Sequence, residues 1–211
     1  MKVEDIIMIQ YKLLTPGPLT TTENVKKEMM TDHCTWDDDY KQITQTIRKK
    51  LLNLAHVKEE EYTAVLMQGS GTFGVESVIT SAVGDHDKLL IIANGAYGER
   101  MADICSHAKI PYMVYEVNYD QIPDAQKVEE LLQENSEITH VSMIHSETTS
   151  GILNDIEAIA KVVKAAGKTM IVDAMSSFGG VDIEVIIPGL SEPPVRTLRA
   201  AIPENESHIF R

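Results

Sequence analysis

The spacing of the hydrophobic positions changes near residue 63. Before it, apolar residues such as Ile43, Ile47, Leu51 and Leu54 recur with helical spacing, and beyond it short apolar runs alternate with amphipathic segments. The apolar runs, predicted as strands, are 63–69, 88–95, 112–117, 139–147 and 169–176. The amphipathic segments, predicted as helices, are 23–30, 39–56, 72–83, 98–108, 125–135 and 155–167. Strands that are apolar throughout and separated by helices indicate a mainly parallel sheet covered on both faces, so we expect a three-layer α/β/α fold.

The net charge of −13 narrows the range of expected partners. An acidic surface repels nucleic acid and anionic membranes, so we expect neither as a partner. A small anionic ligand is compatible with this charge, because a local nest of backbone N–H groups binds an anion whatever the net charge. The composition, with 43% hydrophobic and 24% charged residues in 211, is otherwise that of an ordinary soluble globular protein.

The two cysteines, Cys34 and Cys105, are too few for a disulfide scaffold and favour a reducing, cytoplasmic location. No C-x-x-C or H-x-x-x-H spacing occurs, so no metal site is expected. The first residues are interrupted by acidic side chains and have no small-residue cleavage site, which argues against a signal peptide. No apolar run reaches the roughly 18 residues that a membrane span needs.

The segment 65–77, VLMQGSGTFGVES, contains a G-x-G-x-x-G sequence between a predicted strand and a predicted helix. Glycines let the backbone approach a ligand, and the helix start offers unpaired N–H groups and a positive dipole end to an anion. Ser70 and Thr72 add hydroxyl donors beside Gly71. The loop is therefore a candidate phosphate site, and the alternative interpretation is a tight turn that Thr72 caps.

A dinucleotide site would need an acidic residue at the end of the next strand, to hold the ribose. That strand ends in the letters ANGAY (93–97), which contain no carboxylate. The dinucleotide interpretation is weakened by this and stays open. Tyr97 in the same loop is a candidate ring to stack on a planar ligand, or simply a half-buried loop tyrosine.

Two further strand ends carry polar residues. The segment HSETTSG (145–151) places the five polar side chains of residues 145–149 together, although His145 alone is compatible with a hydrogen-bonded core histidine. Asp173 follows three apolar residues in MIVDAMSSFGG, and a buried carboxylate is costly unless it is paired. It is either the partner of a protonated ring nitrogen, or a cap or ion pair for Lys168 or an arginine. A phosphate cradle, a stacking ring, hydroxyl donors and this acid together suit pyridoxal phosphate.

Several segments in order resemble one enzyme family. They are LLTPGPLTTT, CTWDDDY, LMQGSGTFGVESV, NGAYGERM, HSETTSGILNDI and GKTMIVDAMSSFGGVDI. From about Leu13 to Val185 the chain resembles the 2-aminoethylphosphonate–pyruvate transaminases, class V-like members of the fold type I (aspartate aminotransferase-like) superfamily. The resemblance implies a homodimer that uses pyridoxal 5′-phosphate. The implied reaction moves the amino group of 2-aminoethylphosphonate to pyruvate, which gives phosphonoacetaldehyde and alanine during phosphonate catabolism.

The resemblance also implies roles for individual residues. The cofactor phosphate would be held by Ser70, Gly71 and Thr72. Tyr97 would stack on the ring, Thr148 would lie near the ring hydroxyl, and Asp173 would pair with the ring nitrogen. The loop Pro16, Gly17 and Pro18 would border the substrate pocket.

The resemblance ends after Val185. We expect three parts: an arm with the substrate-side loop (1–38), an incomplete cofactor-binding large domain (39–185), and a poorly ordered tail (186–211). The family's Schiff-base lysine has no counterpart, because no lysine follows Lys168. Lys161, Lys164 and Lys168 are expected to be surface cations. No catalytic residue is therefore assigned, and the 211-residue chain is expected to lack turnover.

Two alternatives to a truncated aminotransferase remain open at this point. One is a non-catalytic α/β remnant or binding module, and the other is a nicotinamide-dependent oxidoreductase that uses the G-x-G-x-x-G loop. Cofactor binding separates the three, since they differ in whether pyridoxal phosphate, NADH or neither binds.

Overall fold

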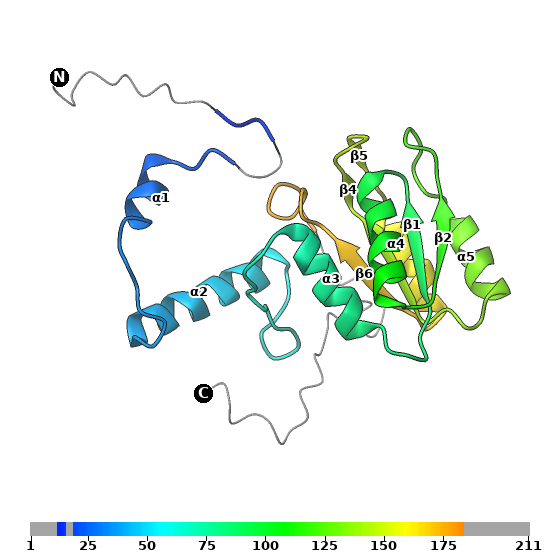
Figure 1. Ribbon diagram of the computed structural model, residues 1–211, viewed down its shortest axis with the longest axis horizontal. Helices are drawn as coiled ribbons and strands as arrows, with labels where there is room; N and C mark the ends of the chain where they lie inside the picture. The colour runs from blue at the N-terminus through cyan, green and yellow to red at the C-terminus, as the bar shows by residue number, and fades with distance from the viewer. Residues whose placement is uncertain (1–11, 16–18, 184–211) are drawn as a thin grey trace. The chain divides into compact units, whose positions relative to one another are not determined.

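The computed structural model describes residues 12–15 and 19–183 (Figure 1). It divides into two units between Thr46 and Ile47, within helix α2 (Asp38–Leu54). The first unit also contains α1 (Glu23–Glu28), which Thr22 caps by accepting a hydrogen bond from the Val25 N–H. The remaining elements belong to the second unit. The predictions for the tail 186–211 and for the loop 16–18 lie outside the described residues.

The second unit is built on a parallel sheet of four strands in the order β2-β1-β3-β6. The strands are β1 (Leu89–Ala93), β2 (Tyr112–Glu116), β3 (His140–Ile144) and β6 (Thr169–Asp173). β1 lies between β2 and β3, and all five of its residues are buried. Because all three pairings are parallel, the carboxyl ends of the four strands lie at the same edge of the sheet.

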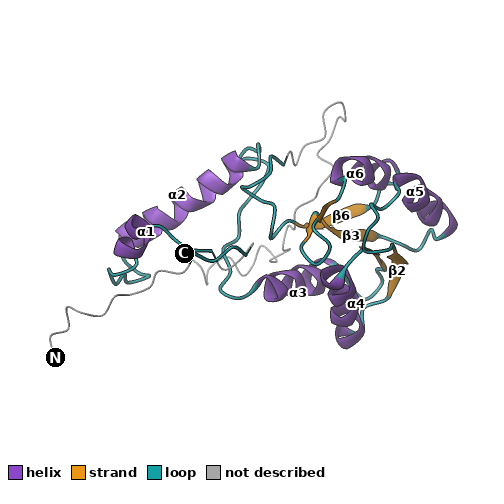
Figure 2. Ribbon diagram, turned by 90° about the horizontal axis from the view of Figure 1, so that it is seen from above, coloured by secondary structure: helices purple, strands orange, loops and turns teal. Residues whose placement is uncertain are grey.

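Four helices cover the two faces of this sheet, as Figure 2 shows. α3 (Gly71–Ala82) and α4 (Ala96–Ala108) lie on one face, and α5 (Ala125–Glu134) and α6 (Ile156–Ala165) lie on the other. The predicted three-layer α/β/α fold with a mainly parallel sheet is therefore confirmed.

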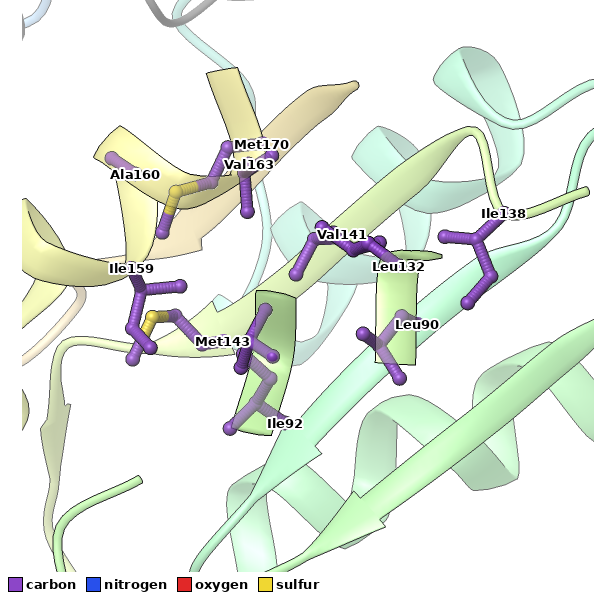
Figure 3. Packing of buried hydrophobic residues seen from close by; sticks show 11 residues of the cluster. Leu90, Ile92, Leu132, Ile138, Val141, Met143, Ile159, Ala160, Val163 and Met170 are labelled. Carbon is purple, nitrogen blue, oxygen red and sulfur yellow. The ribbon is translucent and has the colours of Figure 1, made fainter. Parts of the chain in front are cut away.

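Alternation along the strands divides the core into two clusters. Leu90 and Ile92 of β1 face α5 and α6, whereas Leu89 and Ile91 face α3 and α4. Figure 3 shows the first cluster, in which side chains of β1 and β3 meet those of the two helices. Both faces of β1 are thus apolar, which explains why its sequence is a continuous apolar run rather than an alternating one.

One predicted strand, 63–69, is wrong. The segment has no regular secondary structure and forms no ladder with any described residue, and its apolar side chains Val65, Leu66 and Met67 are exposed. Its sequence is typical of a buried strand, but a strand also needs a neighbour whose backbone groups pair with its own. The other predicted strands and helices are present, with ends shifted by up to three residues.

A short antiparallel pair was not predicted. β4 (Ser146–Glu147) and β5 (Ile152–Leu153) form a hairpin directly after β3, and only β4 lies within the polar segment 145–151. Two-residue strands carry too little periodicity to be recognised from the sequence. None of the helices in the described part of the chain has the length and apolar character that a membrane crossing requires.

Candidate functional site

Three loops meet at the carboxyl edge of the sheet. They are 94–95 between β1 and the start of α4, 145–149 after β3, and 174–177 after β6. Because β1, β3 and β6 are neighbours, these loops open onto one edge, which is where parallel α/β sheets bind their ligands. Backbone and side-chain bonds join the last two loops: the His145 N–H donates to the Asp173 carbonyl at 2.8 Å, and the Ser176 hydroxyl donates to the Ser146 carbonyl at 2.7 Å.

The glycine loop forms the start of α3. Ser70, and not Thr72 as in the alternative interpretation, is the N-cap, and its Oγ accepts a hydrogen bond from the Phe73 N–H at 3.3 Å. Gly71 is the first helical residue, and a Cβ added there would lie 3.0 Å from the Met175 side chain. The close approach of Gly71 to Met175 places the helix start against the loop that follows β6. The N–H groups at the start of α3 therefore lie at the same edge as Asp173.

Asp173 ends β6 as a partly buried carboxylate. Its Oδ1 accepts a hydrogen bond from the Met175 N–H at 2.9 Å. Among the described residues, no lysine, arginine or histidine forms an ion pair with it, and Lys168 instead donates to the Ser136 carbonyl at 3.0 Å. The alternative of an ion pair with Lys168 is thus wrong. The group acts as a local cap, and its charge lacks a cationic partner within the described chain.

The surroundings of Asp173 raise the pKa of its carboxyl above the usual value. Burial is the largest cause, the hydrogen bond from Met175 opposes it, and the nearby charge of Glu147 adds to the rise. A protonated nitrogen placed against this carboxylate would offset both unfavourable effects. A cationic group of a ligand at this position would therefore be electrostatically favourable.

Tyr97 is the second residue of α4, and 41% of it is exposed. The guanidinium carbon of Arg100 lies 5.3 Å from the centre of the Tyr97 ring. Arg100 Nη1 also donates to the Thr72 hydroxyl at 3.2 Å. Arg100 was not singled out from the sequence, although its position three residues after Tyr97 places both side chains on one face of a helix. It links the candidate stacking ring to the glycine loop.

The polar segment 145–151 contributes residues of different kinds. Thr148 is exposed in the turn between β4 and β5. His145 is buried, its Nδ1 has no hydrogen-bond partner among the described residues, and burial lowers the pKa of its ring below the usual value. Glu147 is fully buried and was not assigned a role from the sequence. Nothing in the letters HSETTSG separates an exposed threonine from a buried glutamate.

The three lysines near β6 differ from one another. Lys161 pairs with Glu157 at 2.6 Å on the surface of α6, as a surface cation would. Lys164 is an exception to the expectation, because its Nζ is buried and has no hydrogen-bond partner among the described residues. Residues Pro16, Gly17 and Pro18, predicted to border a substrate pocket, lie outside the described residues.

These features fit pyridoxal phosphate. The group needs an anion site, a planar contact and a carboxylate for its ring nitrogen. The helix start at Ser70 and Gly71, the exposed Tyr97 ring and the cation-free Asp173 carboxylate supply these three at one sheet edge. The unpaired Nδ1 of His145 lies on the neighbouring strand end.

Comparison with known proteins agrees with the fold. The family model described as aminotransferase class V matches residues 22–187. The solved structure of pyridoxamine–pyruvate aminotransferase from Mesorhizobium loti is similar with a TM-score of 0.75 and 29% identity, covering 82% of this chain and 44% of that one. The fold is thus that of fold type I aminotransferases. The chain belongs to the class V aminotransferase family, whose members use pyridoxal phosphate.

Within this family, the chain is similar to transaminases of one substrate type. The 2-aminoethylphosphonate–pyruvate transaminase of Lysinibacillus sphaericus is 61% identical over 178 residues, which are 84% of this chain and 49% of that protein. The bifunctional phosphonoacetaldehyde hydrolase/aminoethylphosphonate transaminase of Clostridioides difficile is 51% identical over 83% of this chain and 28% of its own length. The chain spans about half the length of most of the curated relatives it matches.

Proposed function

We propose that this chain is the cofactor-binding part of a 2-aminoethylphosphonate–pyruvate transaminase and that it binds pyridoxal phosphate at the carboxyl edge of its sheet. The observation that carries the proposal is the half-buried Asp173 carboxylate, which has no described cation and lies beside the start of α3. The 61% identity to the Lysinibacillus sphaericus transaminase supports the choice of reaction.

The proposed residues have separate tasks. Ser70, Gly71 and Thr72 bind the phosphate through hydroxyl groups and the N–H groups of the first turn of α3. Tyr97 covers one face of the ring, and Thr148 lies near the ring hydroxyl. Asp173 holds a proton on the ring nitrogen. When bound, the cofactor supplies an electron sink for the carbon that carries the amino group, which requires that proton.

The substrates proposed are 2-aminoethylphosphonate and pyruvate, which would give phosphonoacetaldehyde and alanine. The names of the relatives support this choice, and the loop 16–18 is the proposed border of the substrate pocket. We further propose a homodimer, which the resemblance supports. We also propose a cytoplasmic location, because the two cysteines are far apart in the sequence and too few for a disulfide scaffold. A polypeptide of these 211 residues has no lysine after Lys168. It should therefore bind the cofactor without producing alanine in a coupled assay.

The proposal is tested by titrating the purified chain with pyridoxal phosphate, pyridoxal and NADH while the protein fluorescence is recorded. We expect saturable binding of pyridoxal phosphate, weaker binding of pyridoxal because it lacks the anion, and no binding of NADH. Binding of NADH without pyridoxal phosphate would support the dinucleotide alternative instead. If none of the three binds, the result would support the alternative of a non-catalytic α/β remnant or binding module.

Substitution of Asp173 sharpens the titration. Asp173→Ala should weaken pyridoxal phosphate binding by about tenfold or more, because one charge-assisted hydrogen bond contributes roughly 1.5–3 kcal/mol. Asp85→Ala is the matched control, since Asp85 is exposed in the turn before β1. Unchanged affinity in a folded Asp173→Ala protein would contradict the role given to this carboxylate.

A further inference from the structure

The amino terminus of α4 lacks a cap from its own flanking residue. Gly95 precedes the helix and has no side chain that accepts a hydrogen bond. Each of α3, α5 and α6 is capped locally, by Ser70, Asp124 and Asp155 respectively. Because the first N–H groups of a helix have no intrahelical partner, those of α4 need acceptors from elsewhere. Their positions matter because Tyr97 is the second residue of this helix.

The acceptors come from about fifty residues further along the chain. The Ala96 N–H donates to Thr149 Oγ1 at 3.1 Å, and the Thr149 hydroxyl donates to Glu147 Oε1 at 2.6 Å. The Gly98 N–H approaches the other carboxylate oxygen, Glu147 Oε2, at 3.4 Å. Glu147 Oε1 also accepts from the Thr149 N–H at 3.1 Å. A buried carboxylate and a hydroxyl thus cap α4 from the hairpin after β3.

The chemistry of this arrangement is favourable on two counts. A carboxylate at a helix amino terminus meets the positive end of the helix dipole, and its buried charge is compensated by several donors. The flanking glycine leaves the necessary room. A Cβ at Gly95 would overlap the Glu147 side chain and would come within 2.6 Å of Thr149 Oγ1. The missing local cap and the distant one are therefore parts of one arrangement.

We propose that Glu147 is a positioning residue: together with Thr149 it caps α4 and thereby sets the Tyr97 ring in place relative to Thr148 at the cofactor site. The proposal rests on the proposed function, because the importance of Tyr97 and Thr148 depends on it. Thr148 lies between the two capping residues in sequence, so one set of hydrogen bonds fixes both the stacking ring and the hydroxyl. Glu147 itself binds no ligand in this account.

A second consequence follows from the charge of Glu147. The negative charge of Glu147 contributes to the raised pKa of the Asp173 carboxyl, so the two carboxylates interact electrostatically at the end of β6. Two carboxylates near one ring nitrogen favour the protonated form of that nitrogen more strongly than one. Removal of the charge should therefore shift the pH dependence of cofactor binding, an effect that a purely structural residue would not have.

The experiment uses the full chain with four substitutions. Thr149→Val removes the hydroxyl relay, Thr149→Ser retains it, and Glu147→Gln replaces one acceptor oxygen with a donor. Glu157→Gln is the matched control, because Glu157 is solvated on α6. The readouts are the pyridoxal phosphate affinity from pH 6 to 9, the circular dichroism of the bound cofactor, and amide hydrogen exchange of Ala96 and Gly98 without cofactor.

We expect Thr149→Val and Glu147→Gln to weaken binding by about tenfold, to lose the cofactor's circular dichroism, and to speed exchange at Ala96 and Gly98. Thr149→Ser and Glu157→Gln should behave as the unsubstituted chain, and only Glu147→Gln should shift the pH profile. Wild-type exchange and affinity in Thr149→Val would overturn the proposal, and this variant also tests it if Glu147→Gln does not fold.

If the unsubstituted chain binds no cofactor, the proposed function fails. The role of Glu147 at the site then fails with it, while amide exchange still reports separately on the capping of α4.

Discussion

Two apolar runs in the second unit have similar sequences and opposite environments. The run Leu89–Ala93 is β1, paired on both sides and buried throughout. The run 64–67 is equally apolar and is also followed by a glycine-containing turn and a helix, yet Val65 is 70% exposed. β1 has β2 and β3 as neighbours, whereas 64–67 has no ladder partner among the described residues. An apolar run therefore becomes a strand only where adjacent backbone is present to pair with it.

The helices that follow the two runs differ in the same way. α4 packs closely on β1, because Gly98 brings its backbone against Ala93. α3 begins at the exposed loop, and Gly74 in its first turn has open space around it. The run, the turn and the helix thus form a packed unit in one case and a looser one in the other. Substitutions in the two regions should consequently have unequal effects.

The largest difference should come from truncating one apolar side chain in each run. Ile91→Ala removes a fully buried side chain from β1 and should lower the free energy of unfolding by about 2–5 kcal/mol. Val65→Ala removes an exposed one and should change it by no more than about 0.5 kcal/mol. Urea denaturation of both proteins is the measurement. An equal loss in the two variants would show that 64–67 is packed in solution, and the comparison would fail.

The two helix glycines give the next largest effect. Gly98→Ala would place a Cβ 2.8 Å from Ala93 Cα, so the helix must shift, and we expect destabilisation by about 1–3 kcal/mol. Gly74→Ala meets nothing within 4 Å and should stabilise α3 by about 0.5–1 kcal/mol. Thermal unfolding of the two variants measures whether each substitution raises or lowers the stability. Destabilisation by Gly74→Ala would mean that the start of α3 is covered.

A smaller effect is expected at the end of the paired region. The raised pKa of Asp173 means that the folded chain binds a proton more tightly than the unfolded chain. Stability is therefore lost as the pH rises from the unfolded-state pKa through the folded-state pKa. Asp173→Asn keeps the Oδ1 acceptor for the Met175 N–H and should stabilise the cofactor-free chain at pH 7. Gln68→Glu, at the exposed run, should leave stability unchanged in the same denaturation series.

The smallest expected effect is the change in stability as the pH falls. Burial lowers the pKa of His145 and of His140 below the usual 6.5, so the unfolded chain takes up protons first as the pH falls. Stability present above pH 6.5 should decline below it. His145→Gln should reduce this decline between pH 7.5 and 5.5, and His33→Gln, an exposed control, should not. An equal decline in both variants would contradict the role of burial.

Most of the fold was predictable because it depends on periodicity. Continuous apolar strands and amphipathic helices gave the layers and the element order. The caps were less predictable, because Thr72 was the cap candidate for α3 and the structure has Ser70 in that place. The strand 63–69 was wrong because pairing depends on residues far away in sequence. The hairpin β4–β5 was missed because two-residue strands leave no pattern.

The site was predictable only at the level of loops. The order of strands brings the segments of Tyr97, Thr148 and Asp173 to one edge, as parallel topology requires. The contacts that join them depend on tertiary structure. The Arg100 bridge to Thr72 spans 28 residues, and the bond between Glu147 and Gly98 spans 49. Neither partner can be identified from spacing along the chain.

The most direct test of the account is a crystal structure of this chain soaked with pyridoxal phosphate. The account predicts the phosphate against the first turn of α3, at Ser70 to Thr72, and the ring nitrogen within hydrogen-bond distance of the Asp173 carboxylate. A cofactor that occupies another surface, or that lies at this edge with its ring nitrogen turned away from Asp173, would contradict it.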